Sequence, residues 1–257
     1  MLNAILESKS GRLSREAEKN IRWSDLFRVS EDLITATVFE RLGYLPAETC
    51  WKLLIEAADG QLPRYRMAEL RSLVFWPMWE AEDRVRGVEL DVFIDLSLGD
   101  PPRRTHVLVE AKHGGEQKVA QLKSEVLAWA ATVEAGDLDP PEHLIIMAIG
   151  GLRSAKSRSQ LEKDFAATMA RIGKDIPELT FVTLDWSDLA RAVGMHAPGS
   201  PHEERIVEDL KRALELYGYF HVVPSTHLEQ MLTSRRVNPH LTSMLMSLNT
   251  KPQETSK

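Results

Sequence analysis

The chain has 257 residues, of which 43% are hydrophobic and 27% are charged, and its formal net charge is −6. These values are ordinary for a globular protein and exclude a wholly disordered chain. A membrane protein is excluded as well, because the apolar runs fall far short of the ~20 residues that a bilayer span needs. The net charge argues against tight nucleic-acid binding over the whole surface, although a local basic groove or a metal-neutralised phosphate site stays open.

Two further features of the composition limit the cellular setting. The single cysteine, Cys50, excludes an internal disulfide framework and a multi-cysteine zinc site. The first residues show neither a basic segment nor a long apolar stretch, so we expect no signal peptide and a cytoplasmic protein.

Helices and strands are expected to alternate along most of the chain. Ser30 is expected to cap the first helix, because Glu31 and Asp32 follow it in the first turn, and Gly43 is expected to end that helix. In chain order the expected elements are helices at 30–42 and 47–58, strands at 73–80, 85–96 and 106–112, a helix at 116–131, a strand at 143–149, a helix at 157–172, a strand at 179–186, and helices at 187–193 and 203–217.

This order predicts an α/β protein with a mixed central sheet of about five strands flanked by helices, plus C-terminal helices. We expect one domain over residues 24–220, with a core at 24–150. An N-terminal arm at 1–23 is expected to be loosely ordered or to form a short helix, and the polar extension at 221–257 is expected to be partly disordered.

Acidic side chains fall on strands that are otherwise apolar. In the second expected strand, alternation places Leu90 and Val92 on one face and Asp91 on the other. In the third, Glu110 and Lys112 are two residues apart and therefore point the same way. An acid and a lysine at the end of a buried strand are costly unless they pair with each other or bind a metal.

The first helix supplies another inward-facing acid. At about 100° per residue, Glu31 falls near the middle of the apolar stripe, whereas Glu40 falls on the opposite side, toward solvent. Asp32 lies on the flank of that stripe, and the choice between Glu31 and Asp32 stays open.

An acid on the first helix, an aspartate on the second strand and Glu-x-Lys on the third form the signature of the PD-(D/E)XK nuclease superfamily, which this chain resembles. The matching residues are Glu31, Asp91 and Glu110-Ala111-Lys112. The expected order helix–strand–strand–strand–helix–strand is also that of the superfamily core. The resemblance covers roughly residues 24–150 and implies a restriction-endonuclease-like fold.

Two positions qualify the resemblance. Leu90 stands where many members have the proline that precedes the aspartate. In several branches a glutamine on the helix after the third strand completes the site. Gln121 fits that position, with Gln117 as the competing choice.

The resemblance implies hydrolysis of phosphodiester bonds in DNA with Mg²⁺ or Mn²⁺, which prefer oxygen ligands and lower the pKa of a bound water. Lys112 would orient or deprotonate that water or hold the scissile phosphate, and burial could lower its pKa. Gln121 would position a phosphate by hydrogen bonding. The implied metal ligands are Asp91, Glu110, the carbonyl of Ala111, and Glu31 as the ligand of a second metal or of a metal-bound water.

Each of these residues also has an ordinary structural interpretation. Asp91 could lie on the exposed face of an edge strand, and Glu110 with Lys112 could form a surface ion pair. Glu31 could simply complement the helix dipole, and Gln121 could be a helix-surface residue.

The acidic net charge bears on partners and on alternatives. DNA would be delivered by a partner subunit, or a homodimer would combine two weak grooves, and the resemblance implies a bacterial defence or mobile-element setting. The alternative is a nuclease-fold module with weak or absent catalysis that serves binding or assembly. A hydrolase of small phosphate esters is a third interpretation. Phe75, Trp76 and Trp79 could stack on bases, although packing under the sheet is the ordinary interpretation.

Overall fold

The structure is a computed structural model that describes residues 12–13, 21–22, 30–81, 84–152, 154–172 and 176–221. The described residues up to Phe220 belong to one compact unit. Most of the expected arm at 1–23 and nearly all of the expected extension at 221–257 lie outside the described residues. Within the arm, β1 (Arg12–Leu13) pairs antiparallel with β2 (Ile21–Arg22), so these two pieces are not helical.

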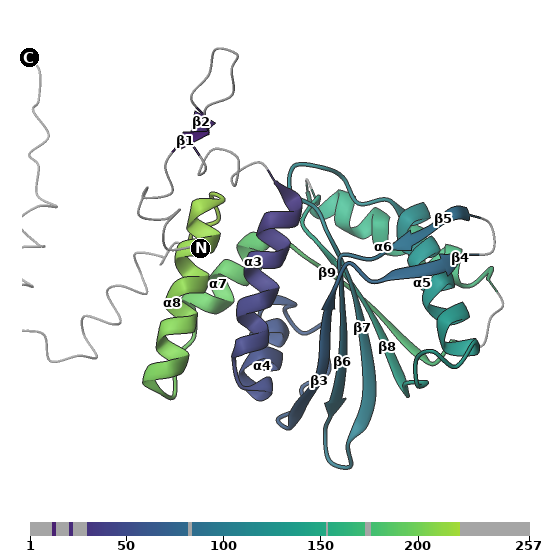
Figure 1. Cartoon of the computed structure of the whole chain (residues 1–257), viewed down its shortest axis with the longest axis horizontal. Helices are drawn as coiled ribbons and strands as arrows, with labels where there is room; N and C mark the ends of the chain where they lie inside the picture. The colour runs from purple at the N-terminus through teal and green to yellow at the C-terminus, as the bar shows by residue number, and fades with distance from the viewer. Residues whose placement is uncertain are drawn as a thin grey trace, which may run out of the picture. The chain divides into compact units, whose positions relative to one another are not determined.

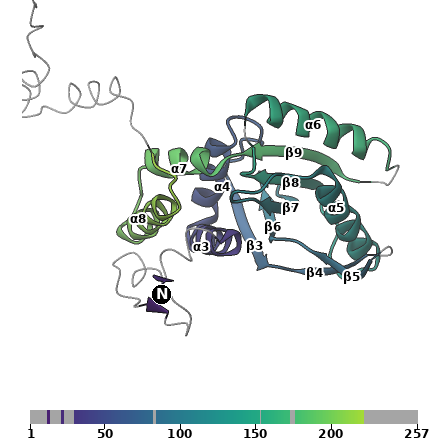
Figure 2. The same ribbon diagram turned by 90° about the horizontal axis from the view of Figure 1, so that it is seen from above.

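A five-stranded mixed sheet forms the middle of the fold (Figures 1 and 2). The first three strands in the order β3-β6-β7-β8-β9 are antiparallel neighbours, while β8 lies parallel to β7 and β9 parallel to β8. The predicted α/β class with a mixed sheet of about five strands is therefore confirmed. The strands are β3 (Ala68–Phe75), β6 (Val92–Leu98), β7 (Arg103–Ala111), β8 (His143–Ile149) and β9 (Glu178–Leu184).

Helices cover both faces of the sheet, as Figure 2 shows. Every residue of β8 is buried, as expected for a central parallel strand that packs on both sides. One face is covered by α3 (Glu31–Tyr44), α4 (Ala47–Ala57), α7 (Trp186–Met195) and α8 (Pro201–Leu216), and the other by α5 (Val119–Glu134) and α6 (Ala155–Met169).

The first helix begins where the sequence predicts and ends later. The hydroxyl of Ser30 accepts a hydrogen bond from the Leu33 N–H at 3.4 Å, which confirms the predicted cap. The prediction that Gly43 ends the helix is wrong, because the helix continues to Tyr44. The chain leaves the helical conformation at Leu45, which precedes Pro46, and a residue before proline is driven into extended conformations.

Two expected strands are each broken where the chain leaves the main sheet. A separate hairpin of β4 (Met78–Ala81) and β5 (Arg84–Glu89) extends toward α5, and the expected turn at Asp83 lies outside the described residues. The Trp76 N–H donates to the carbonyl of Asp91 at 3.1 Å, and the Leu90 N–H donates to the carbonyl of Pro77 at 3.2 Å. These two bonds link the segment that enters the hairpin to the segment that leaves it.

This break overturns the predicted faces of the second strand. Leu90 packs in the core beneath α5, whereas Val92 packs in the core beneath α3, so the two do not share a face. The alternation restarts because Leu90 and Asp91 lie between β5 and β6 and belong to neither strand.

No helix in the described part of the chain is both long enough and apolar enough to span a bilayer.

Candidate active site at the end of β7

The last residues of β7 lie where several elements meet. Glu110 and Ala111 end the strand, and the Lys112 N–H bonds to the carbonyl of Ile149 at the end of β8, at 2.8 Å. Glu31 approaches from the first turn of α3, Asp91 from the break between β5 and β6, and Gln121 from the first turn of α5. The five side chains that the sequence nominates therefore meet at one place.

The Lys112 ammonium lies at the centre of this group and is only 16% exposed. Its Nζ donates to Glu31 Oε1 at 3.1 Å, to the carbonyl of Ala111 at 3.2 Å, and to Glu110 Oε1. Burial opposes the charge, but the contacts with Glu110 and Glu31 outweigh it and raise the pKa of Lys112 above its ordinary value. Burial does act to lower this pKa, as expected, but the two carboxylates outweigh it, so Lys112 is a cation that donates hydrogen bonds.

Of the two acids at the start of α3, Glu31 is the one that reaches the group. Its second oxygen, Oε2, accepts from the His113 N–H at 2.7 Å, so the carboxylate spans two consecutive residues after β7. Asp32 is exposed, and so is Glu40 on the far side of the helix. Because Ser30 caps the start of α3, it also fixes the position of Glu31 in the first turn, opposite Lys112.

Asp91 is attached to the same strand end. Its Oδ2 accepts a hydrogen bond from the Ala111 N–H at 2.7 Å. Burial, followed by the nearby charge of Glu110, raises the pKa of Asp91 to about 7, while the Ala111 bond and Lys112 act in the opposite direction. An aspartate that titrates near neutrality fits a site that is short of positive charge.

The two competing glutamines have different partners. Gln121 donates from Nε2 to Glu110 Oε1 at 2.7 Å, so it reaches the carboxylate itself. Gln117 donates to the main-chain carbonyls of Glu110, Ile149 and Gly150 at 3.2–3.3 Å and ties the ends of β7 and β8 together. The structure thus brings Gln121 into the side-chain cluster and gives Gln117 a main-chain role.

Glu125 is a site residue that the sequence analysis missed. It lies one helical turn after Gln121 on the same side of α5, is only 1% exposed, and both of its carboxyl oxygens are buried without a hydrogen-bond partner. Burial, followed by the nearby charge of Glu110, raises its pKa to about 10. The available signal was the position of Glu125 between Leu122 and Val126 on the apolar side of its helix.

The main chain around Lys112 is tightly enclosed. The indole N–H of Trp186 donates to the Lys112 carbonyl at 3.0 Å, and the ring of His113 contacts the Tyr219 hydroxyl at 2.9 Å. A Cβ at Gly150, where φ is +68°, would lie 2.2 Å from the Lys112 carbonyl oxygen. Only glycine leaves room for the two strand ends to approach this closely.

The donor chemistry of the site fits a hard divalent cation. Oxygens of Glu31, Glu110 and the Ala111 main chain already surround one cationic nitrogen, and Mg²⁺ takes oxygen ligands with only one or two carboxylates. The two carboxyl oxygens of Glu125, which have no hydrogen-bond partner among the described residues, are further oxygen ligands that a cation could use. As the side chains stand, no group of three or more His, Cys, Asp or Glu among the described residues is arranged to hold a metal.

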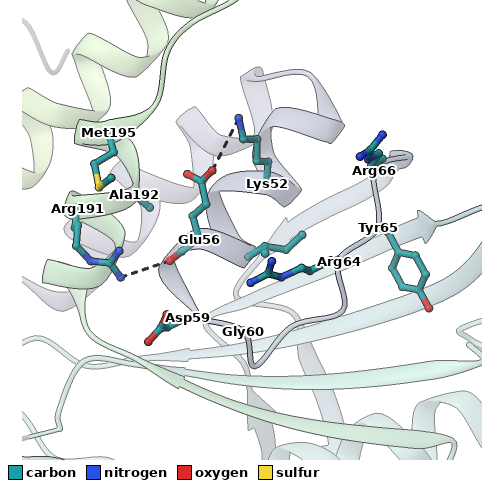
Figure 3. Close-up of a pocket in the computed structure, with 11 residues that line it drawn as sticks. Lys52, Glu56, Asp59, Gly60, Arg64, Tyr65, Arg66, Arg191, Ala192 and Met195 are labelled. Carbon is teal, nitrogen blue, oxygen red and sulfur yellow. Dashed lines mark hydrogen bonds and ion pairs between the residues drawn. The ribbon is translucent and has the colours of Figure 1, made fainter. Parts of the chain in front are cut away.

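A cavity of about 660 Å³ lies elsewhere, between α4, α7 and the segment that leads into β3 (Figure 3). Its charges have both signs: Lys52 lies 3.9 Å from Glu56, and Arg191 reaches the Glu56 carbonyl at 3.5 Å. None of the nominated residues lines it. The candidate site is therefore the group at the end of β7 and not this cavity.

Comparison with known proteins gives a distant relative. The chain is 26% identical over 231 residues to the uncharacterized protein PM0110 of Pasteurella multocida (strain Pm70), covering 85% of this chain and 80% of that protein. No family model matches the chain. No solved structure matches it.

Proposed function

We propose that this protein is a metal-dependent nuclease of the PD-(D/E)XK type that hydrolyses phosphodiester bonds in DNA. The observation that supports the proposal is the meeting of Asp91, Glu110 and Lys112 at one strand end, joined by Glu31 and Gln121. These residues come from four separate segments, so their meeting is a property of the fold and not of local sequence.

The order of elements also supports a restriction-endonuclease-like core. A helix precedes three antiparallel strands, and the third is followed by a helix and a parallel strand. Asp91 precedes the middle strand of the three, and Glu110 and Lys112 stand at the end of the last. The proposed core therefore runs from α3 to β8.

Mg²⁺ or Mn²⁺ would be held by Asp91, Glu110 and the Ala111 carbonyl, with Glu31 available to a second ion or a coordinated water. The ion would supply an acidified water and charge stabilisation at the phosphorus. Lys112 remains an ammonium and is suited to hold a phosphate oxygen by charge and hydrogen bonding. Gln121 keeps the Glu110 carboxylate in a fixed orientation.

The remaining parts of the proposal concern setting and partners. We propose a cytoplasmic enzyme of a bacterial defence or mobile-element system. Because the net charge is −6, we propose that a partner subunit or a second copy of the chain supplies part of the DNA-binding surface.

A second candidate function is a nuclease-fold module that binds or assembles without cutting. Two observations favour it: Lys112 occupies the middle of the carboxylates, and no group of three ligating side chains among the described residues is arranged around a metal position.

Plasmid nicking separates the two candidates. Wild type would be assayed with Mg²⁺, with Mn²⁺ and with EDTA, alongside four single variants. Three of them change the site, Asp91→Ala, Lys112→Ala and Glu31→Ala, and the fourth, Glu40→Ala, is the control. We expect metal-dependent nicking that falls at least ~100-fold in the first three variants, because each removes a charge from the reacting centre. Glu40→Ala, an exposed acid on the same helix, should cut like wild type.

Retained nicking in Asp91→Ala would indicate a contaminating nuclease and would contradict the proposal. Absence of cutting with every metal, together with a bound protein partner, would favour the module. Turnover of a small model diester without affinity for DNA would favour a small-substrate hydrolase.

A further inference from the structure

The backbone beside Asp91 contains a residue in a rare conformation. Trp76 has φ +50°, in the left-handed region, which is uncommon for residues other than glycine, asparagine and aspartate. The next residue is Pro77, and a residue before proline is further driven toward extended conformations. Two factors therefore disfavour a tryptophan in this conformation.

The surrounding structure holds this conformation in place. The Trp76 N–H donates to the Asp91 carbonyl at 3.1 Å, and the Leu90 N–H donates to the Pro77 carbonyl at 3.2 Å. The chain needs a sharp bend here because it leaves β3 for the separate β4–β5 hairpin. A glycine would make this bend at less cost, so the bend does not explain a tryptophan.

The side chain of Trp76 is also not required by the core. Trp79 is buried in the core beneath α5, as the ordinary interpretation of this aromatic cluster expects, but Trp76 is 38% exposed. Its only ring contact among those described is with Phe75, tilted by 41° with centroids 5.5 Å apart. Val74 and Met78 on either side are exposed as well. A planar apolar side chain is thus partly open to solvent on a residue whose N–H bonds to the main chain of Asp91.

We propose that Trp76 is a stacking platform for an unpaired nucleobase of the DNA strand that enters the site. This inference rests on the proposed function, since it takes the ligand of the neighbouring carboxylates to be DNA. An indole face accepts any base without reading its edge, and it needs a base that is free of duplex stacking. Strained residues of this kind collect at functional sites.

The proposal also addresses the acidic net charge. Most nucleic-acid binders obtain affinity from phosphate contacts, which a chain of net charge −6 offers only locally. Base stacking does not depend on positive charge, so it supplies affinity that salt screens weakly. The expected substrate is single-stranded DNA, or duplex DNA with an unpaired base at an end or a nick.

The test measures binding in EDTA, so that no cleavage is involved. Fluorescence anisotropy would give the affinity of the full chain for a labelled oligothymidylate, for an abasic oligomer with the same backbone, and for a duplex of the same length. Wild type should bind the oligothymidylate most tightly. Trp76→Gly should bind it about 5- to 150-fold more weakly, which converts to about 1–3 kcal/mol at 1.4 kcal/mol per tenfold.

Variants at this position separate stacking from folding. Trp76→Gly suits the left-handed backbone and should keep or raise the melting temperature while it loses affinity, a combination that a structural tryptophan would not show. Trp76→Asn, which tolerates the same backbone, is the second ring-less variant, and Trp76→Phe should retain most of the affinity. Tyr44→Ala removes a more exposed aromatic ring, 58% against 38% for Trp76, at the far end of α3 and should bind like wild type.

Three results would overturn the inference: unchanged affinity in the ring-less variants, equal affinity of wild type for the abasic oligomer, or no binding of wild type to any of the three probes. The nicking assay reports on the carboxylates separately. Ring-dependent binding by a protein that never cuts would therefore contradict the nuclease proposal and leave the stacking platform standing.

Discussion

Two buried polar clusters both include residues of β7, and they differ in how their charges are balanced. The first, which we call the paired cluster, consists of Asp95, Arg104, His106 and Trp129. Arg104 binds both oxygens of Asp95, with Nε–Oδ1 at 3.2 Å and Nη2–Oδ2 at 2.7 Å. The Trp129 indole N–H donates to His106 Nδ1 at 3.1 Å, and burial lowers the pKa of His106 to about 4, which keeps the ring neutral.

The second cluster, at the end of β7, has an excess of acids. Glu31, Asp91, Glu110 and Glu125 face the ammonium of Lys112, and no residue in the described part of the chain donates a hydrogen bond to Glu125. A buried cluster that serves only stability pairs its charges, as Asp95 and Arg104 do, although the neutral His106 ring leaves its Nε2 without a hydrogen-bond partner. The unsatisfied acids are therefore what distinguishes the candidate site from an ordinary buried ion pair, and each prediction below tests that distinction.

The largest loss of stability is expected at Gly150, which packs against the end of β7. Gly150→Ala should destabilise the protein by about 3 kcal/mol or more, because its Cβ would meet the Lys112 carbonyl oxygen at 2.2 Å in a left-handed backbone. Gly114→Ala has the same backbone penalty with nothing within 4 Å and should cost about 1 kcal/mol. Urea unfolding of both variants measures the difference, and equal losses would mean that the close approach is unimportant.

Breaking the paired cluster should lower stability without touching the site. Arg104→Ala leaves the buried Asp95 carboxylate with the half-exposed Arg71, 3.6 Å away, and the neutral His106 ring, 3.8 Å away, and should cost about 2–3 kcal/mol. Arg71→Ala, which removes the more exposed arginine, should cost less than about 1 kcal/mol. Nicking by the folded fraction of Arg104→Ala should remain at the wild-type rate, and a loss of cutting would show that the two clusters are coupled.

Replacing the buried, protonated Glu125 by a neutral amide should instead raise stability. Because the pKa of Glu125 rises from 4.5 to about 10 on folding, the folded protein holds a proton that the unfolded chain releases above pH 4.5. Wild type therefore loses stability as pH rises from 4.5 toward 10, by at most about 1.4 kcal/mol per pH unit from this group. Glu125→Gln should be about 1–2 kcal/mol more stable than wild type at pH 7, since its buried amide recovers only part of the gain.

Denaturant titrations of Glu125→Gln and wild type at several pH values measure this gap. The gap should widen with pH and be absent below pH 4. A gap that stays constant with pH would mean that Glu125 is not the titrating group.

Metal ions should stabilise one cluster and not the other. At ten times its dissociation constant, Mg²⁺ or Mn²⁺ should add about 1.4 kcal/mol, or a rise of roughly 3–5 °C in melting temperature. Glu110→Gln should abolish this rise, whereas Asp95→Asn should melt earlier but keep it. A rise that survives in Glu110→Gln would place the ion elsewhere.

The sequence predicted those parts of the site that depend on local periodicity. The cap at Ser30 and the helical stripe are set by neighbouring residues, so the inward direction of Glu31 followed from about 100° per residue. The pairing of Glu110 with Lys112 followed from the alternation of β7. The strand at 143–149 was predicted at its observed bounds because a continuous apolar run between loops is a strong local pattern.

Features that depend on distant contacts were not predictable. The break at Leu90–Asp91 arises because β4 and β5 pair with each other outside the main sheet, and no local pattern encodes that pairing. The direction in which the pKa of Lys112 shifts depends on its distances to Glu31 and Glu110, which only the fold sets. The sequence places Glu125 on the apolar side of its helix, but its approach to Glu110 depends on how α5 packs on the sheet.

The β4–β5 hairpin is an insertion whose two ends already touch. Because Trp76 is hydrogen-bonded to Asp91, and Pro77 to Leu90, the chain between them could lengthen, shorten or be exchanged without shifting β6 against β3. Trp79 and Val88 of the hairpin are buried in the core beneath α5, so such changes are expected to spare these two side chains while the carboxylate at the hairpin's exit keeps its position. A grafted hairpin that keeps these two buried side chains would leave the rest of the scaffold unaltered.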